Sequence, residues 1–242
     1  KNMEWRLFVP IIDESRPELQ QIYSEIDHLF QQFIPDQEEE SRSDSYFVTS
    51  HEFGVKYRHG KKLELKVKSK TPSRLGIELW TKSKLGKSEI DLQIDNVLDH
   101  LGRSGYQEEQ AKFRSIIQRK KTVEVVKSRK VGLINPVSVE YCKLSARGQR
   151  WVSVAVESYS AEEIARFLSS HDLIHQLFAL ISRFYTITRP IEGRERSVHV
   201  VLGGYPFWVQ YIDGSHEGSD LVHSNTILRE IFSLKGLDDT IL

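Results

Sequence analysis

The sequence contains a single cysteine, Cys142, which excludes an intramolecular disulfide framework and a cysteine-based zinc site. It also lacks an excess of charge, because 34 Lys and Arg side chains balance 34 Asp and Glu side chains, so non-specific electrostatic binding of nucleic acid is not favoured. No window approaches the roughly 18 apolar residues of a membrane span, and the N-terminal residues lack the apolar core of a signal peptide. We therefore expect a soluble protein without membrane association, cytoplasmic by default, with a nuclear location left open.

Apolar residues are nevertheless plentiful. Of the 242 residues, 39% are hydrophobic and 10% aromatic, which is enough for a packed core. Alternating and β-prone segments predict strands at residues 5–12, 46–49, 55–58, 63–68, 76–82, 122–130, 137–144, 151–157 and 197–201. Most of these strands are joined by short turns. We expect an α+β fold built around a curved or closed antiparallel sheet.

Helical spacing of apolar residues predicts the remaining elements. A first helix is expected after Ser15 as N-cap, with Pro17 in its first turn. A later helix opens with Ser160 and Glu163 in the capping-box pattern and runs on to about residue 185. Residues 36–44 are interpreted as a charged connector, and further helices are predicted at residues 94–101, 108–117 and 225–233.

Two neighbouring strands carry charge on one face only. Lys56 and Arg58 alternate with Val55 and Tyr57, and the segment LELKVK that follows repeats the pattern. A sheet with one solvated face is the commonest cause of such alternation. The alternative is a barrel whose interior is ionic and wide enough to hold an anion that neutralises the like charges. Alternation alone does not say which side of the sheet is inside.

A series of short motifs bears on this choice. Residues 44–49 (DSYFVT), 55–58 (VKYR), 63–66 (LELK) and 127–129 (KSR) resemble, in order, the D-x-Y-F-D-T, L-R-I-R, L-T-(L/Y)-K and K-x-R motifs of the CYTH or triphosphate tunnel metalloenzyme superfamily. Residues 151–157 stand where that superfamily has a late E-x-E strand. The resemblance extends collinearly over about residues 3–170.

This resemblance implies a tunnel-like antiparallel barrel of about eight strands with helices packed outside. We expect one domain over residues 1–242: residues 1–189 form the barrel and its helices, and residues 190–242 pack on it with a strand, an aromatic patch and a short helix. In the superfamily, basic side chains bind a triphosphate, and glutamates bind Mg²⁺ or Mn²⁺ that assists attack by water. The implied ligand is a triphosphate-containing small molecule or an RNA 5′ end.

Carried over by position, the resemblance assigns three sets of residues. The catalytic pair is Glu64 and Glu140, and the metal ligands are Glu4, Glu64 and Glu157. The phosphate-binding residues are Arg6, Lys56, Arg58, Lys66, Lys68, Lys127 and Arg129.

The acidic motifs depart from the pattern more than the basic ones. Arg6 or Trp5 replaces the second N-terminal glutamate, and Val48 replaces an aspartate. The late strand reads Ser153-Val154-Ala155 in place of the E-x-E motif. Fewer carboxylates weaken a magnesium site. We favour a phosphate- or polyanion-binding protein, a binding or structural subunit with lost or weakened metal-dependent triphosphatase activity. The alternative is a divergent metal-dependent hydrolase of inorganic triphosphate, a nucleoside triphosphate or an RNA 5′-triphosphate, so whether the chain is an enzyme stays open.

The C-terminal segment GGYPFWVQY lies outside the resemblance. Gly203 and Gly204 are predicted to form a turn before an aromatic strand. The aromatic residues from Tyr205 to Tyr211 are expected either to pack in the core or to form the contact surface for a protein partner.

Overall fold

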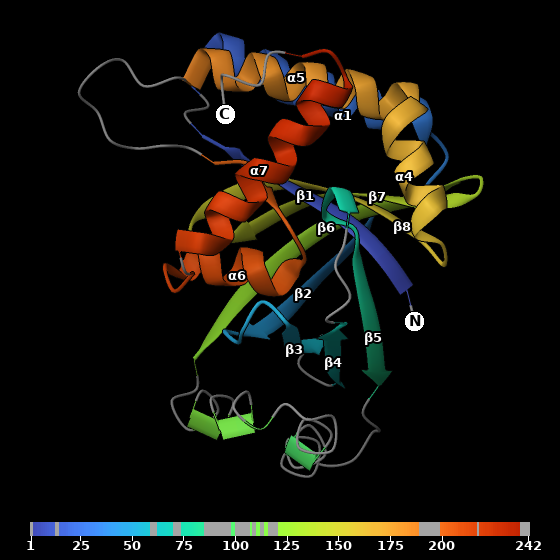
Figure 1. Ribbon diagram of the computed structural model, residues 1–242. Helices are drawn as coiled ribbons and strands as arrows, with labels where there is room; N and C mark the ends of the chain where they lie inside the picture. Colours follow the sequence, from blue (N-terminus) through green and yellow to red (C-terminus); the bar gives the residue numbers. More distant parts are fainter. Residues whose placement is uncertain are drawn as a thin grey trace.

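The computed structural model describes residues 2–12, 15–58, 62–69, 74–84, 98–99, 107, 110–111, 114–115, 121–188, 199–216 and 218–237. It shows an antiparallel barrel with helices packed against its outer surface (Figure 1). Apart from a few isolated positions, the predicted helices at residues 94–101 and 108–117 lie outside the described residues, as does the start of the predicted strand at residues 197–201.

Eight strands make the barrel. They are hydrogen-bonded in the order β5 (Glu78–Lys84), β4 (Lys62–Lys68), β3 (Phe53–Arg58), β2 (Glu40–Phe47), β6 (Thr122–Ile134), β7 (Val137–Ala146), β8 (Gln149–Ser158) and β1 (Asn2–Ile11). The start of β1 pairs with β5 and closes the barrel. Further along the same edge of β1, Leu7 and Phe8 pair with the short strand β9 (Val201–Leu202). The predicted α+β fold with a closed antiparallel barrel is therefore confirmed.

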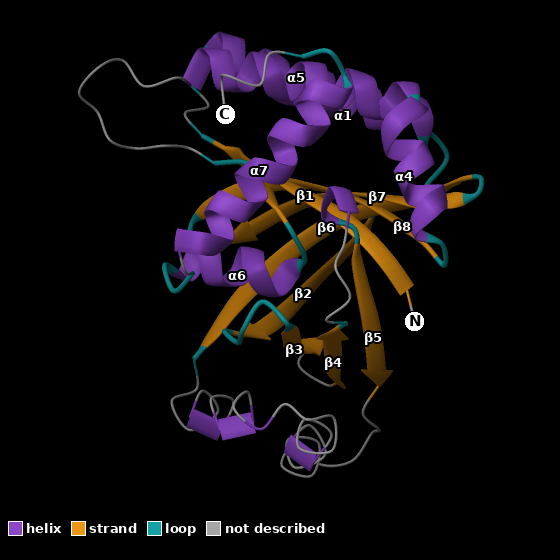
Figure 2. Cartoon of the chain, in the orientation of Figure 1, coloured by secondary structure: helices purple, strands orange, loops and turns teal. Residues whose placement is uncertain are grey.

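Helices cover one side of the barrel (Figure 2). They are α1 (Pro17–Phe33), α4 (Ala161–Ser170), α5 (Asp172–Thr188) and α7 (Gly218–Leu234), and the 3₁₀ turn η1 (Arg74–Gly76) lies against α7. Their apolar stripes form one large cluster with the outward-facing residues of β1, β7 and β8. A fully buried side chain of this kind contributes about 1.5–3 kcal/mol, so this layer is the main stabilising core. None of the described helices is long and apolar enough to cross a membrane.

Two of the predicted helix details need correction. The N-cap of α1 is Arg16, which makes no side-chain capping bond, rather than Ser15, although Pro17 does begin the helix. The predicted cap of α4 is confirmed, because the Glu163 N–H donates to Ser160 Oγ at 3.3 Å. The long helix predicted after Ser160 is wrong as a single element. It divides at His171, whose Nδ1 accepts a bond from the Leu173 N–H at 3.2 Å and so caps α5.

Alternation along the strands separates the helix-covered outside from the inside of the barrel. On β1, Trp5 and Leu7 pack in the helix layer, while Glu4 and Arg6 line an internal cavity. On β3, Val55 belongs to an outer apolar cluster and Lys56 lines that cavity. The charged face predicted for β3 and β4 is thus the inner face. The segment interpreted as a connector is also corrected, because β2 begins within it at residue 40.

The C-terminal aromatic segment is a helix, α6 (Tyr205–Asp213), and not the predicted strand. Tyr205, Phe207 and Trp208 are buried, and the Trp208 ring stacks on Phe8 with centroids 4.9 Å apart. These three aromatics therefore form part of the core. The last helix, α7, is also longer than the short helix predicted at residues 225–233.

Candidate anion-binding site inside the barrel

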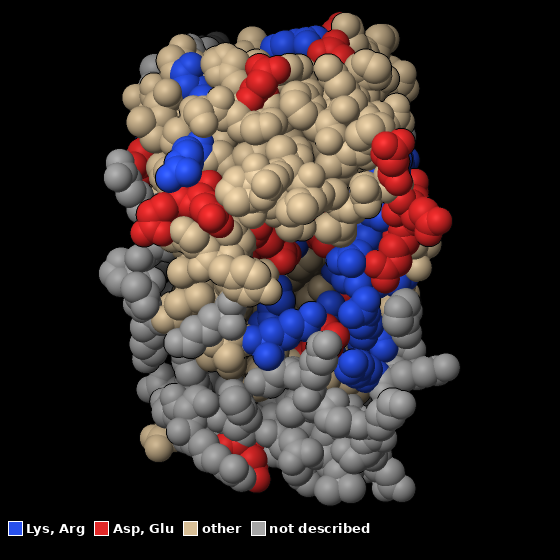
Figure 3. Space-filling model, turned by 90° about the vertical axis from the view of Figure 1, so that its right-hand side faces the viewer, with Lys and Arg blue, Asp and Glu red and all other residues tan. Residues whose placement is uncertain are grey.

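All eight barrel strands contribute charged side chains to one cavity of about 200 Å³. Six are cationic and four are carboxylates, an excess of two positive charges. On one face of the molecule, basic side chains gather round a hollow that has acidic side chains within it (Figure 3). The charged lining residues are Glu4, Arg6, Arg42, Lys56, Glu64, Lys66, Lys82, Arg129, Glu140 and Glu157.

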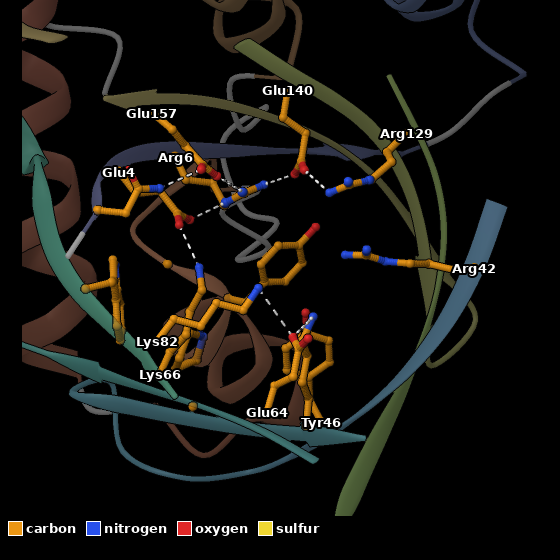
Figure 4. A pocket seen from close by; sticks show the side chains of 17 residues that line it. Glu4, Arg6, Arg42, Tyr46, Glu64, Lys66, Lys82, Arg129, Glu140 and Glu157 are labelled. Atoms are coloured by element: carbon orange, nitrogen blue, oxygen red, sulfur yellow. Dashed lines mark hydrogen bonds and ion pairs between the residues drawn. The ribbon is translucent and has the colours of Figure 1, made fainter. Parts of the chain in front are cut away.

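Arg6 lies among three glutamates (Figure 4). Its Nε is 2.7 Å from Glu4 Oε1, and its Nη1 is 2.7 Å from Glu140 Oε1. Its Nη2 is 3.7 Å from Glu157 Oε1, and Nη1 also donates to the Ser153 hydroxyl at 3.0 Å. The guanidinium lies over the Tyr205 ring, 4.6 Å from its centroid, and the side chain is only 3% exposed. Arg6 is therefore held by protein groups on every nitrogen.

Further cations hold the outer oxygens of two of these carboxylates. Lys66 Nζ lies 2.8 Å from Glu4 Oε2, and Arg129 Nη1 lies 2.7 Å from Glu140 Oε2. Burial raises the pKa of the Glu4 carboxyl, but Lys66 and Arg6 outweigh that effect, and the pKa lies well below its usual range. Glu140 is likewise buried, but Arg6 and Arg129 lower its pKa to about 2. Both carboxylates are thus ionised at neutral pH.

Glu157 differs from these two carboxylates. Burial and the neighbouring Glu4 raise its pKa, although Arg6 and Lys66 oppose the rise. Its Oε2 accepts a hydrogen bond from the Asn2 side-chain amide at 2.7 Å.

A second acidic group lies on β4, away from Arg6. The Glu64 carboxylate is ion-paired with Lys56 and Arg58 at 3.5 Å and with Lys82 at 3.6 Å. Neither of its oxygens has a hydrogen-bond partner among the described residues, although both are buried. Burial raises the pKa of Glu64, but Lys56 and Lys82 lower it overall.

Deeper in the wall, Lys127 and Asp44 form a buried pair. Lys127 Nζ donates to the Tyr46 hydroxyl at 2.6 Å and lies 3.6 Å from the centroid of the Tyr205 ring. Burial and the neighbouring Lys56 lower the pKa of the Lys127 ammonium well below its usual value. Lys127 is 1% exposed and packs behind the two tyrosines that line the cavity.

The residues predicted to bind phosphate are only partly gathered at the cavity. Lys56, Lys66 and Arg129 line it, and Arg6 does so with its Nε and Nη1 bonded to Glu4, Glu140 and Ser153. Arg58 pairs with Glu40 and Glu64, and Lys68 pairs with Glu78 at 3.0 Å. The predicted catalytic pair, Glu64 and Glu140, projects from opposite walls of the cavity (Figure 4).

Sequence reasoning missed two cationic lining residues. Arg42 falls in the segment interpreted as a connector, and its spacing from Asp44 and Tyr46, which puts all three on one face of β2, was the available signal. Lys82 shares an inner face with Trp80 on β5, and the alternation in GIELWTK was visible. Its position outside the recognised motifs kept it from the predicted set.

The carboxylates as they stand do not fit Mg²⁺ or Mn²⁺. Such ions need several oxygen ligands directed at one point. Of the predicted metal ligands, Glu4 and Glu157 pair across β1 and β8, whereas Glu64 belongs to the second group of charges. Within the described residues, no three Asp, Glu, His or Cys side chains are arranged to hold a metal ion. Each carboxylate faces a protein cation instead.

No family model matches the chain, and no curated protein matches it significantly in sequence. Solved structures give distant matches. A putative adenylyl cyclase from Hippeastrum, described as having a dominant triphosphatase activity, is 12% identical with a TM-score of 0.41, over 90% of this chain and 98% of that one. A putative adenylate cyclase from Bacillus halodurans is 14% identical with a TM-score of 0.42, over 78% and 93%. A conserved hypothetical protein from Pyrococcus furiosus is 16% identical with a TM-score of 0.38, over 75% and 90%. At this level of similarity, function has to be inferred from the cavity itself.

Proposed function

We propose that the barrel binds a phosphate-bearing anion and has lost metal-dependent triphosphatase activity. The observation that carries this proposal is the cationic lining, to which each of the strands β1 to β6 contributes one Lys or Arg. Like charges repel when they converge, so an anion that neutralises the excess is the natural ligand. The cations in question are Arg6, Arg42, Lys56, Lys66, Lys82 and Arg129.

The size of the cavity limits what enters it. Sites for drug-sized ligands occupy roughly 300–1,000 Å³, whereas this cavity measures about 200 Å³. Phosphate groups therefore fit inside, and an organic moiety attached to them extends toward the opening. The N-terminus of α6 borders the cavity with Gly204, Tyr205 and Pro206. A triphosphate-containing small molecule or an RNA 5′ end meets these requirements.

The pairing of the carboxylates supports binding without hydrolysis. A metal-assisted attack by water requires carboxylates that are free to hold the ion. Glu4 and Glu140 are hydrogen-bonded to two cations each, and Glu64 is surrounded by three. These carboxylates set the geometry of the cations, as ion-pair partners do in a preorganised site.

Binding is tested with inorganic tripolyphosphate by isothermal titration calorimetry in EDTA. Because a hydrogen bond to a charged group contributes about 1.5–3 kcal/mol, Lys82→Gln should weaken binding by about 10-fold or more. The matched control is Lys143→Gln: Lys143 is also a half-exposed lysine paired with a carboxylate, Asp27, and lies outside the cavity. Absence of tripolyphosphate binding, or equal effects of the two variants, would refute the proposal.

Catalysis is tested separately by phosphate release from tripolyphosphate, ATP and 5′-triphosphorylated RNA with Mg²⁺ or Mn²⁺. We expect release no faster than in EDTA. Metal-dependent turnover that Glu64→Gln and Glu140→Gln abolish would establish the divergent hydrolase instead. The two assays thus separate failure of binding from retention of activity.

A further inference from the structure

Three carboxylates direct one oxygen each at the guanidinium of Arg6. The oxygens are Oε1 of Glu4, Glu140 and Glu157, and each faces a different nitrogen of Arg6, at 2.7, 2.7 and 3.7 Å. They come from β1, β7 and β8, and Figure 4 shows them on three sides of the guanidinium. Carboxylate oxygens are also the ligands of a hard divalent metal ion, although with Arg6 in place these three are not arranged to hold one.

The second oxygen of each carboxylate has a separate donor. Lys66 holds Glu4 Oε2 at 2.8 Å, Arg129 holds Glu140 Oε2 at 2.7 Å, and the Asn2 amide holds Glu157 Oε2 at 2.7 Å. These bonds do not involve Arg6. They hold each carboxylate from outside, so we expect the three carboxylates to stay near one another when the guanidinium is removed.

The backbone also places these groups independently of Arg6. Glu4 is directly opposite Glu157 in the β1–β8 ladder. Arg6 is opposite Ala155, and Ala155 is opposite Glu140 in the β7–β8 ladder. Antiparallel register fixes the spacing of such residues. The small side chain of Ala155 leaves the space between β1 and β7 to the guanidinium and the Glu140 carboxylate.

Charge balance shows what Arg6 contributes. The three carboxylates face three cations, Arg6, Lys66 and Arg129, so the group is neutral. Without the Arg6 charge, one negative charge and three unpaired inner oxygens remain in a buried place. Buried unpaired charge is unfavourable, and a divalent cation with bound water would relieve it.

We propose that Arg6 is an internal cation that takes the place of a divalent metal ion between Glu4, Glu140 and Glu157. The native chain accordingly needs no metal at this point, and a chain with a neutral residue at position 6 acquires a site for Mg²⁺ or Mn²⁺. This inference goes beyond the proposed function, because it holds whether or not the cavity binds phosphate.

The test compares Arg6→Gln, which removes the charge, with Arg6→Lys, which keeps it. Binding of Mn²⁺ is measured by electron paramagnetic resonance of the free ion. We expect Arg6→Gln to bind one Mn²⁺ at least 10-fold more tightly than either the native protein or Arg6→Lys. With Mn²⁺ about a hundredfold above Kd, its Tm should rise by about 5 °C or more. A second change, Glu157→Gln, should remove both gains and so locate the ion.

Several results overturn the inference. Equal Mn²⁺ binding by the native protein and Arg6→Gln would mean that Arg6 does not occupy the place of the ion. Absence of binding by folded Arg6→Gln would mean that the three oxygens do not form a site.

Should Arg6→Gln be unfolded without metal, the measurement becomes recovery of near-ultraviolet circular dichroism. Recovery with Mn²⁺ but not with an equal concentration of Na⁺ supports the inference, and failure to recover refutes it. Tripolyphosphate binding by the native protein is a separate measurement, so the two proposals can fail independently.

Discussion

The Nζ of Lys127 lies 3.2 Å from Oδ2 of Asp44, and neither side chain is more than 1% exposed. Removing one partner of a buried ion pair costs about 3–5 kcal/mol, because the other charge stays buried and unpaired. Asp44 also pairs with Lys56 at 3.0 Å and Arg42 at 3.4 Å. Loss of Asp44 therefore leaves three basic side chains together without their carboxylate, whereas loss of Lys127 leaves the carboxylate with two partners.

We accordingly expect Asp44→Asn to destabilise the protein more than Lys127→Met does. The double variant should lose less free energy of unfolding than the sum of the two single changes, because it leaves neither charge without its partner. Urea unfolding at pH 7 measures all four proteins. A larger loss of stability for Lys127→Met than for Asp44→Asn, or strict additivity of the two changes, would show that this ion pair does not determine the stability of this part of the barrel.

Acid should unfold the protein through its buried carboxylates. Burial raises the pKa of Glu140, but Arg6 and Arg129 outweigh it and lower the pKa to about 2; burial likewise raises the pKa of Asp44, but Lys127 and Lys56 lower it to about 2. Unfolded Asp and Glu titrate near pH 4, so the folded values are depressed. The stabilisation is then complete above about pH 5 and disappears as the pH falls toward 2, on the order of 2–3 kcal/mol for each group.

The measurement is the free energy of unfolding in urea at steps between pH 7 and pH 2. Glu140→Gln should be less stable at pH 7 and should lose less stability on acidification than the native protein. A parallel pH dependence of the two proteins would mean that Glu140 is not responsible.

Contact between β3 and the first turn of α6 closes one side of the cavity. A Cβ atom at Gly54 would lie 2.6 Å from Cγ of Pro206, too close for any real contact. Overpacking of this kind costs typically about 1–3 kcal/mol, so Gly54→Ala should lower the free energy of unfolding by that amount. Pro206→Ala removes the obstructing ring and should reduce the cost of Gly54→Ala in the double variant. Chemical unfolding of the four proteins gives the coupling, and zero coupling would place the strain elsewhere.

Alternation showed that β3 and β4 have one charged and one apolar face, because every second residue of a strand faces the same way, and the resemblance to the tunnel motifs then placed the charged face inside. The same rule failed for β2. In its sequence ESRSDSYF, serines occupy the other face of the strand from Arg42 and Asp44. No alternation of apolar and polar residues therefore indicates a strand there. Helix α6 was predicted as a strand for a related reason. Six of its nine residues are buried, and periodicity does not distinguish a helix from a strand in so short an apolar run.

The partners of Arg6 were beyond sequence reasoning. Glu140 is 134 residues away in the chain, and only the pairing of β1 with β8, which pairs in turn with β7, brings it close to Arg6. The sequence therefore identified Arg6 as a basic residue of the tunnel wall but assigned it to phosphate. Two of its three carboxylate neighbours, Glu140 and Glu157, are a property of the strand order and register, which short motifs do not contain.

Arg42 gives the most direct test of a residue that the sequence did not identify. Its side chain is 7% exposed and lines the cavity, and its Nε has no hydrogen-bond partner among the described residues. Its nearest carboxylate atoms are Asp44 Oδ2 at 3.4 Å and Glu40 Oε1 at 3.6 Å. A buried guanidinium with donors to spare gains from an anion that accepts them.

We expect Arg42→Gln to weaken tripolyphosphate binding by about 10-fold or more, measured by calorimetry, because a charged hydrogen bond contributes about 1.5–3 kcal/mol. Arg42→Lys should bind tripolyphosphate more weakly than the native protein and more tightly than Arg42→Gln, since a lysine keeps the charge but lacks the planar fork that matches phosphate oxygens. Arg183→Gln is the control, because Arg183 is also paired with a carboxylate, Glu25, but on the outer surface of α5. If Arg42→Gln bound tripolyphosphate as the native protein does and lost only stability, Arg42 would be a structural partner of Asp44 and not a ligand-binding residue.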